Sequence, residues 1–122
     1  MRPSVGLAGV LALFALAACQ TSVEPTTQDL VADGQAIAEA NCASCHAIGA
    51  AGASPRTDAP PFREIGERYH FPVLEEELTA GIGVGHPPMP HFQFTPRGTD
   101  ALLAYMRHVQ ETGREDEDGA NQ

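Results

Sequence analysis

The chain has 122 residues, which is enough for one compact domain and little else. Its 16 acidic and 7 basic residues give a formal net charge of −9, and every basic residue is an arginine. A surface with this charge disfavours nucleic acid and anionic lipid headgroups as partners. The composition therefore argues against nucleic-acid binding and favours protein partners with basic docking surfaces.

The N-terminal segment has the features of an export signal. Arg2 precedes an apolar stretch over residues 5–18, which is too short to span a bilayer. We therefore expect residues 1–18 to be a signal peptide that is absent from the mature protein. The mature chain is expected to work outside the cytoplasm.

The end of this segment resembles the lipobox of bacterial lipoproteins. In the run Leu16-Ala17-Ala18-Cys19, cleavage before Cys19 leaves that cysteine as a lipid-modified first residue. Lipid chains bind a membrane in proportion to the methylene groups that they bury. The resemblance implies a protein of the bacterial periplasm that Cys19 anchors to a membrane. The alternative is ordinary export with cleavage after Ala17, which leaves Cys19 as a free thiol in an oxidising compartment.

The remaining chain divides into a tether, a domain and a tail. Residues 19–28 include a polar stretch with Pro25 and form a short tether between the lipid and the fold. Residues 29–110 carry the periodic apolar pattern of a folded domain. Residues 111–122 contain five acidic residues and one arginine, so we expect an acidic disordered tail there.

The first part of the domain predicts helices. Apolar or small residues recur at helical spacing over residues 30–41, with Thr26 or Thr27 as the cap. A short helix is expected to open at Pro61, and another to have Pro72 in its first turn.

The second part predicts a loop and a last helix. Glycines and prolines make residues 81–95 a loop, and Gly81 is expected to end the helix before it. Thr95 and Pro96 are typical of a cap and a first turn, and Gly113 is expected to end the helix that they start. The chain is therefore predicted to be all-α, with three to four helices.

The strongest chemical signal is the run Cys42-Ala43-Ser44-Cys45-His46. Two thiols separated by two residues can each add across a vinyl group of haem, and His46 then reaches the iron. A thioredoxin-like dithiol uses only the cysteines and follows a strand, whereas a helix is predicted before this motif. A zinc site needs a second pair of ligands. The motif therefore predicts one covalently bound haem c.

The predicted iron ligand His46 needs a partner for its second ring nitrogen. An imidazole that binds a metal usually donates from the other nitrogen to a carbonyl, which fixes the ring orientation and the tautomer. Pro60 or Pro61 is expected to supply that carbonyl. The alternative is that both prolines only shape a loop.

The other axial ligand has six candidates in the sequence: Met89, Met106, His70, His86, His91 and His108. Met106 lies on the apolar stripe of the last helix, where a methionine usually fills the core. Met89 lies between prolines, which restrict the backbone of its loop. Ordering this loop to hold a weak, neutral sulfur ligand on iron therefore costs little conformational entropy. We therefore expect Met89 to bind the iron. His86 and His91 are expected to be plain loop residues, with donation to the ligand or rival ligation as alternatives.

These features together resemble class I cytochrome c. Gly34 lies eight residues before Cys42, where that family has a glycine that lets the N- and C-terminal helices cross closely. Leu102-x-x-Tyr105 resembles the family's C-terminal helix pattern, and Met89-Pro90 resembles its ligand loop. The resemblance implies an all-α cytochrome c domain over residues 29–110, with crossing terminal helices and one haem.

The chain departs from the family pattern in three ways. Ala38 stands where many members have an aromatic residue, and residues 59–62 only approximate the Gly-Pro-Leu segment after the haem motif. The positive docking ring of mitochondrial cytochrome c has no counterpart, because the chain contains no lysine. We therefore expect a differently packed helix crossing and different redox partners.

The sequence predicts an electron carrier rather than an enzyme, with His46 and Met89 as axial ligands. A neutral thioether stabilises ferrous iron relative to a second imidazole, so a comparatively high potential is expected. Two alternatives use the same residues. One is a haem-bearing subunit of a larger oxidoreductase complex, and the other is a haem enzyme in which Met89 leaves an iron position open.

Overall fold

The computed structural model describes residues 24–81 and 89–120, and in these ranges the chain is all-α. The helices, in chain order, are α1 Thr27–Asn41, α2 Phe62–Arg68, α3 Phe71–Ala80 and α4 Pro96–Ala120. No β-strand occurs in either range. The predicted class and the predicted number of helices are both confirmed.

Helix α1 begins at a capping box. The Thr26 hydroxyl accepts from the Asp29 backbone N–H at 3.2 Å, and the Asp29 carboxylate accepts from the Thr26 backbone N–H at 2.9 Å. These two bonds satisfy donors that have no partner inside the helix. The helix therefore starts three residues before the apolar stripe that predicts it, with Thr26 rather than Thr27 as the cap.

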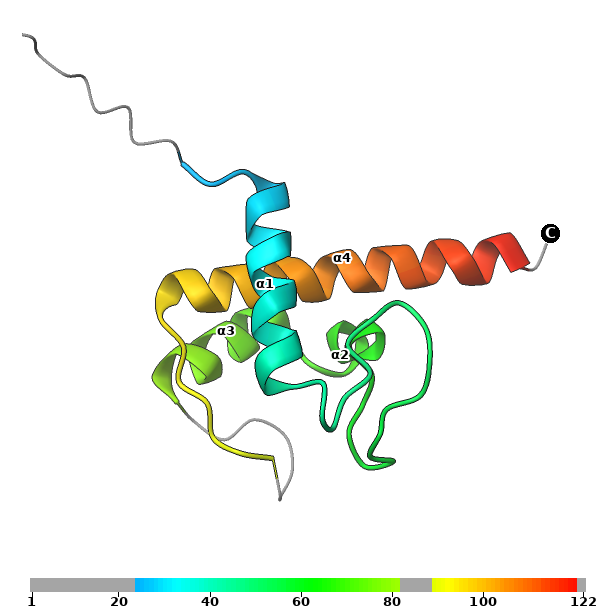
Figure 1. The fold of residues 1–122 in the computed structure, drawn as a ribbon, viewed down its shortest axis with the longest axis horizontal. Helices are drawn as coiled ribbons and strands as arrows, with labels where there is room; N and C mark the ends of the chain where they lie inside the picture. The colour runs from blue at the N-terminus through cyan, green and yellow to red at the C-terminus, as the bar shows by residue number, and fades with distance from the viewer. Residues whose placement is uncertain (1–23, 82–88, 121–122) are drawn as a thin grey trace, which may run out of the picture.

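Helices α1 and α4 cross in direct contact (Figure 1). At the crossing, Gly34 of α1 lies against the backbone of Ala101 and the side chain of Tyr105, both of α4. Only a residue without Cβ fits at this separation. Ala38, one turn further along α1, is fully buried, so α1 contributes small residues to the crossing and the aromatic side chain there, Tyr105, comes from α4.

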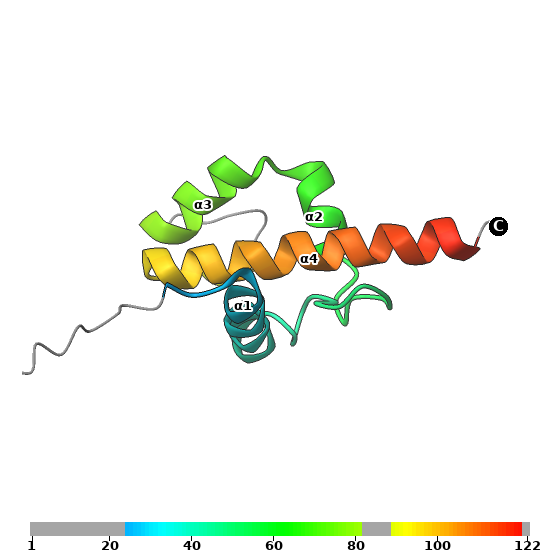
Figure 2. The ribbon, with the colours of Figure 1, turned by 90° about the horizontal axis from the view of Figure 1, so that it is seen from above.

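The two short helices cover the other side of α4. Figure 2 shows α1 on one side of α4 and both α2 and α3 on the opposite side. Pro72 stands in the first turn of α3, and Gly81 ends that helix with the left-handed backbone angle φ of 76°. The predicted proline start and glycine stop of this helix are both confirmed.

The last helix is longer than the sequence predicts. It starts at Pro96, where the Thr95 hydroxyl accepts from the Gly98 N–H at 3.1 Å, and it continues to Ala120. The predicted end at Gly113 is therefore wrong, and residues 111–120 are helical where the sequence predicts a disordered tail (Figure 1). Gly113 is buried, and a Cβ there would lie 3.3 Å from the carbonyl oxygen of Ala50. This glycine makes room for a neighbouring segment and does not stop the helix.

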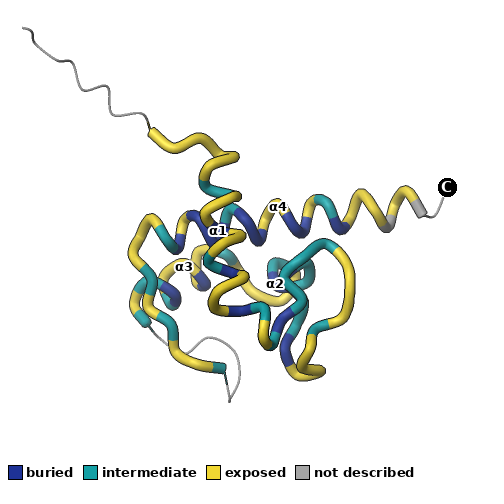
Figure 3. Tube along the Cα trace, in the orientation of Figure 1, coloured by how far each residue is buried: buried dark blue, intermediate teal, exposed yellow. Residues whose placement is uncertain are grey.

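Buried residues recur along α4 and on the segments packed against it (Figure 3), and their side chains form a core cluster. The core combines residues of all four helices with one haem-motif cysteine: Ala38, Cys42, Phe62, Ile65, Leu74, Leu78, Leu102, Leu103, Tyr105, Met106 and Val109. In the part of the chain that the structure describes, no helix is long and apolar enough to cross a membrane.

Candidate functional site

The cysteine motif forms a tight turn at the end of α1. Cys42 is the C-cap of the helix, and its carbonyl oxygen accepts from the N–H groups of Cys45 at 3.0 Å and His46 at 2.9 Å. The turn buries Cys42 and leaves Cys45 half-buried. Neither thiol takes part in a disulfide. Both are therefore available for thioether bonds.

The Cys42 thiol lies in an apolar environment. Burial raises its pKa from 9.0 to about 11, and the nearby Cys45 adds to the shift. Burial has this effect because it penalises the charged thiolate. A thioether has no ionisable group, so attachment to an apolar cofactor suits this position.

His46 is oriented by a backbone carbonyl. Its side chain is buried, with Nδ1 2.7 Å from the carbonyl oxygen of Pro60. A carbonyl oxygen only accepts, so Nδ1 carries the proton and Nε2 keeps its lone pair. The sequence left Pro60 and Pro61 open as the partner, and the structure shows that Pro60 accepts this bond. The ring is thereby prepared to bind a metal through Nε2.

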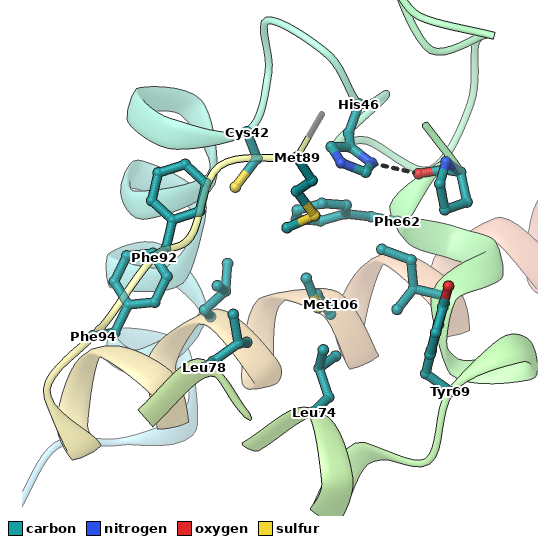
Figure 4. A pocket seen from close by; sticks show the side chains of 13 residues that line it. Cys42, His46, Phe62, Tyr69, Leu74, Leu78, Met89, Phe92, Phe94 and Met106 are labelled. Atoms are coloured by element: carbon teal, nitrogen blue, oxygen red, sulfur yellow. Dashed lines mark hydrogen bonds between the residues drawn. The ribbon is translucent and has the colours of Figure 1, made fainter. Parts of the chain in front are cut away.

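His46 lies on a pocket that is almost entirely apolar (Figure 4). Helices α2, α3 and α4 and the segment after residue 88 all contribute to it, and its lining residues are Cys42, His46, Pro60, Phe62, Ile65, Tyr69, Leu74, Leu78, Met89, Phe92, Phe94, Leu102 and Met106. An adjoining hollow includes Cys45 together with Cys42, His46 and Met89. The two thiols, the imidazole and a thioether therefore converge on one site.

Two methionines line this pocket, and their surroundings differ. Met106 is a buried member of the core on α4. Met89 is half-buried, lies outside the core cluster and lines both the pocket and the hollow beside Cys45. Figure 4 shows its side chain directed into the pocket on the side of His46.

The other predicted candidates lie elsewhere. His70, His91 and His108 are exposed and are not among the pocket-lining residues. His86 and Cys19 lie outside the residues that the structure describes. Of the candidate axial ligands that the structure describes, only Met89 and Met106 line the pocket of His46.

The segment that carries Met89 is fixed at its far end. The N–H of Phe94 donates to the carbonyl oxygen of Leu78 in α3 at 3.0 Å, and the rings of Phe92 and Phe94 stack with centroids 5.8 Å apart. The side chain of Gln93 packs over Gly81, the αL residue that ends α3. Helix α3 and this segment therefore form one wall of the pocket.

The residues present fit a covalently bound haem. A porphyrin is a large apolar ring, and the pocket offers it an apolar lining with two thiols at one edge. His46 has a fixed tautomer, which leaves one nitrogen for iron. A thioether and an imidazole are both known axial ligands of haem iron. Fold and site together define a haem-binding protein of the c type.

Comparison with known families agrees with this conclusion. The family model described as Cytochrome c matches residues 31–110, which is more than half of the chain. The chain belongs to the cytochrome c family. Membership implies covalent haem c, electron transfer and redox protein partners, and such cytochromes are typically extracytoplasmic. No curated protein and no solved structure gives a significant match.

Two residues that matter for the site were not identified from the sequence. Phe62 follows Pro61, where the sequence predicts the start of a short helix, but its ring lies beside the His46 imidazole, with centroids 5.8 Å apart. Gln110 is buried and donates to the carbonyl oxygen of Phe62 at 3.3 Å. The sequence contains a pattern that marks Gln110: its amide follows Val109 and interrupts the apolar stripe of the last helix.

Proposed function

We propose that this protein is a one-electron carrier with a single haem c attached to Cys42 and Cys45, and with His46 and Met89 as axial ligands. The observation that carries the proposal is that Cys42, His46 and Met89 line one apolar pocket and meet Cys45 in the hollow that adjoins it, with Nδ1 of His46 bonded to Pro60. When bound, the haem supplies one iron that alternates between the ferrous and ferric states.

The residues around the pocket have distinct tasks in this proposal. Cys42 and Cys45 hold the cofactor at one edge. His46 presents Nε2 to the iron because its Nδ1–H donates to the carbonyl oxygen of Pro60. Met89 presents a neutral sulfur, which favours the ferrous state relative to a second imidazole. The apolar walls exclude water. The proposed carrier therefore has a comparatively high potential.

The proposed partners are redox proteins with basic docking surfaces. The whole chain carries a formal charge of −9, and α3 and α4 present exposed acidic residues, among them Glu75, Glu76, Glu111, Glu115 and Asp116. Complementary charge speeds the encounter of two proteins, and salt weakens this effect. Electron transfer to such a partner is expected to slow as ionic strength rises.

The proposed location is the periplasmic face of a bacterial membrane. The support is the sequence alone: a signal peptide over residues 1–18 and a lipobox that ends at Cys19. Mass spectrometry of the mature N-terminus tests this part directly. A lipid-modified Cys19 supports the anchor, and an unmodified Cys19 refutes it while leaving the proposed haem chemistry intact.

Visible spectroscopy tests the proposed carrier. With both axial positions filled by protein ligands, purified holoprotein is expected to be low-spin in both oxidation states and not to bind carbon monoxide at neutral pH. A high-spin ferric spectrum, or rapid carbon monoxide binding to the ferrous protein, would indicate an open iron position and favour the enzyme alternative. Co-purification with a dehydrogenase or a reductase from the native membrane would instead favour the subunit alternative.

A further inference from the structure

Gln110 is the one side chain on the inner face of α4, among the described residues, that brings an amide into the core. It is 5% exposed, and its Nε2 donates to the carbonyl oxygen of Phe62, the first residue of α2, at 3.3 Å. Burial of an amide is unfavourable unless its polar atoms find partners. The bond therefore ties the start of α2 to α4.

Gly66 of α2 makes this bond possible. A Cβ at Gly66 would overlap the side-chain amide of Gln110, so the amide lies directly on the backbone of α2. The atoms that such a Cβ meets are the end of a flexible side chain. A small change at Gly66 would thus displace the Gln110 amide without changing its residue type.

Phe62 connects this contact to His46. Its N–H donates to the carbonyl oxygen of Ala47 at 2.9 Å, and its ring lies beside the His46 imidazole. Pro60, whose carbonyl accepts from Nδ1 of His46, is only two residues before Phe62. The carbonyl of Phe62, bonded to Gln110, is therefore part of the short segment that places the carbonyl of Pro60.

We propose that Gln110 is a positioning residue for the iron ligand His46, acting through Phe62 and Pro60. The inference rests on the proposed function only in that His46 binds the iron. By holding the start of α2, Gln110 keeps the carbonyl of Pro60 in place to accept from Nδ1. That bond makes the imidazole a more basic ligand, which favours ferric iron and lowers the midpoint potential.

The test uses Gln110→Met, which keeps a long side chain and removes the donor, in the full-length holoprotein. Two quantities are measured in the same sample: the solvent exchange rate of the His46 Nδ1 proton by NMR of the ferrous state, and the midpoint potential. We expect exchange to be about tenfold faster, as for loss of one supporting hydrogen bond. The midpoint potential is expected to rise.

Gly66→Ala is the second variant, because it leaves Gln110 in the sequence and moves its amide. It is expected to shift both quantities in the same direction as Gln110→Met, and the double variant is expected to show less than the sum of the two effects. Thr112→Val is the matched control on the same helix. Among the described residues its hydroxyl donates only within α4, to the carbonyl of His108 at 2.9 Å and of Val109 at 3.2 Å. We expect this control to leave both quantities unchanged.

Lower thermal stability in Gln110→Met and Gly66→Ala with unchanged Nδ1 exchange and potential would overturn the proposal, because Gln110 would then only stabilise the fold. If Gln110→Met does not fold, Gly66→Ala decides by the same two readouts. The failure of the proposed function has a separate signature. In the wild-type protein, the NMR chemical shifts of the His46 ring protons report whether this imidazole binds haem iron. Shifts unlike those of a haem-bound imidazole would refute ligation by His46, and with it the role of Gln110.

Discussion

Gly34 of α1 lies directly against the backbone carbonyl of Ala101 in α4, with no room for a side chain between them. The neighbouring contact on α4 is the Cβ of Tyr105, at 2.8 Å from the position that a Cβ on Gly34 would take. Backbone atoms cannot move aside as a flexible side chain can. The backbones of the two helices therefore approach too closely at this position for any side chain to fit between them.

Gly34→Ala is expected to destabilise the holoprotein. Alanine is the better helix former by about 1 kcal/mol, so propensity alone predicts stabilisation. Overpacking opposes this and is expected to cost about 3 kcal/mol, the upper end of the usual range, because the atoms in the way belong to the Ala101 backbone. The free energy of unfolding is therefore expected to fall by about 2 kcal/mol net. Denaturant unfolding, followed by far-ultraviolet circular dichroism, measures the difference.

Gly49→Ala is the control for this prediction. A Cβ at Gly49 would have nothing within 4 Å, and its backbone angle φ is not positive. We expect a change of less than about 0.5 kcal/mol. Equal stability of Gly34→Ala and wild type would show that the helices can separate freely, contrary to the structure.

The capping box of α1 predicts a dependence on pH. Hydrogen bonds from the Thr26 side chain and backbone lower the pKa of Asp29 below its usual 3.8. The carboxylate therefore contributes stability above the unfolded-state pKa, and this contribution is lost as the pH falls through the lowered value. Thr26→Ala is expected to lose about 1 kcal/mol at neutral pH.

Asp29→Asn checks the sign of this pH effect. Its stability is expected to lie below that of wild type at neutral pH, and the difference is expected to shrink as the pH falls through the Asp29 pKa. Urea titrations at a series of pH values measure it. A difference that stays constant down to the lowest pH would show that the Asp29 charge has no part in the cap.

The ion pair between α1 and α4 is expected to contribute little. Arg97 Nη2 lies 3.1 Å from Asp33 Oδ2, but the two side chains are 62% and 53% exposed. Exposed pairs of this kind contribute between zero and about 1 kcal/mol and are screened by salt. A double-mutant cycle with Asp33→Asn and Arg97→Gln at low and high salt measures the coupling. A coupling well above 1 kcal/mol that is insensitive to salt would contradict this prediction.

The sequence predicted the helices well where a local signal marks their ends. Gly81 does end α3, and Thr95 does cap α4, because an αL glycine and a side-chain cap act within one turn. The signal failed at Gly113. A glycine on an exposed helix end is a stop, but Gly113 is buried against Ala50, and only the folded chain shows that contact.

The site was predictable to the extent that covalent chemistry fixes residue spacing. Cys42, Cys45 and His46 follow from the motif, and a carbonyl partner for His46 follows from metal-ligand chemistry. The choice of Pro60 over Pro61 depends on the path of the chain. The sequence marks Gln110 as an amide in the apolar stripe of the last helix, but its contacts with Phe62 and Gly66 depend on how α2 packs against α4.

The proposed electron carrier depends on the identity of the second axial ligand, and Met89→Leu with Met106→Leu tests that identity as a matched pair. Both substitutions replace a sulfur with a hydrocarbon of similar size, and both residues line the pocket. The measurement is the weak near-infrared absorption band of thioether-bound ferric haem. We predict that Met89→Leu abolishes the band and that Met106→Leu retains it. Loss of the band in Met106→Leu with retention in Met89→Leu would contradict the assignment.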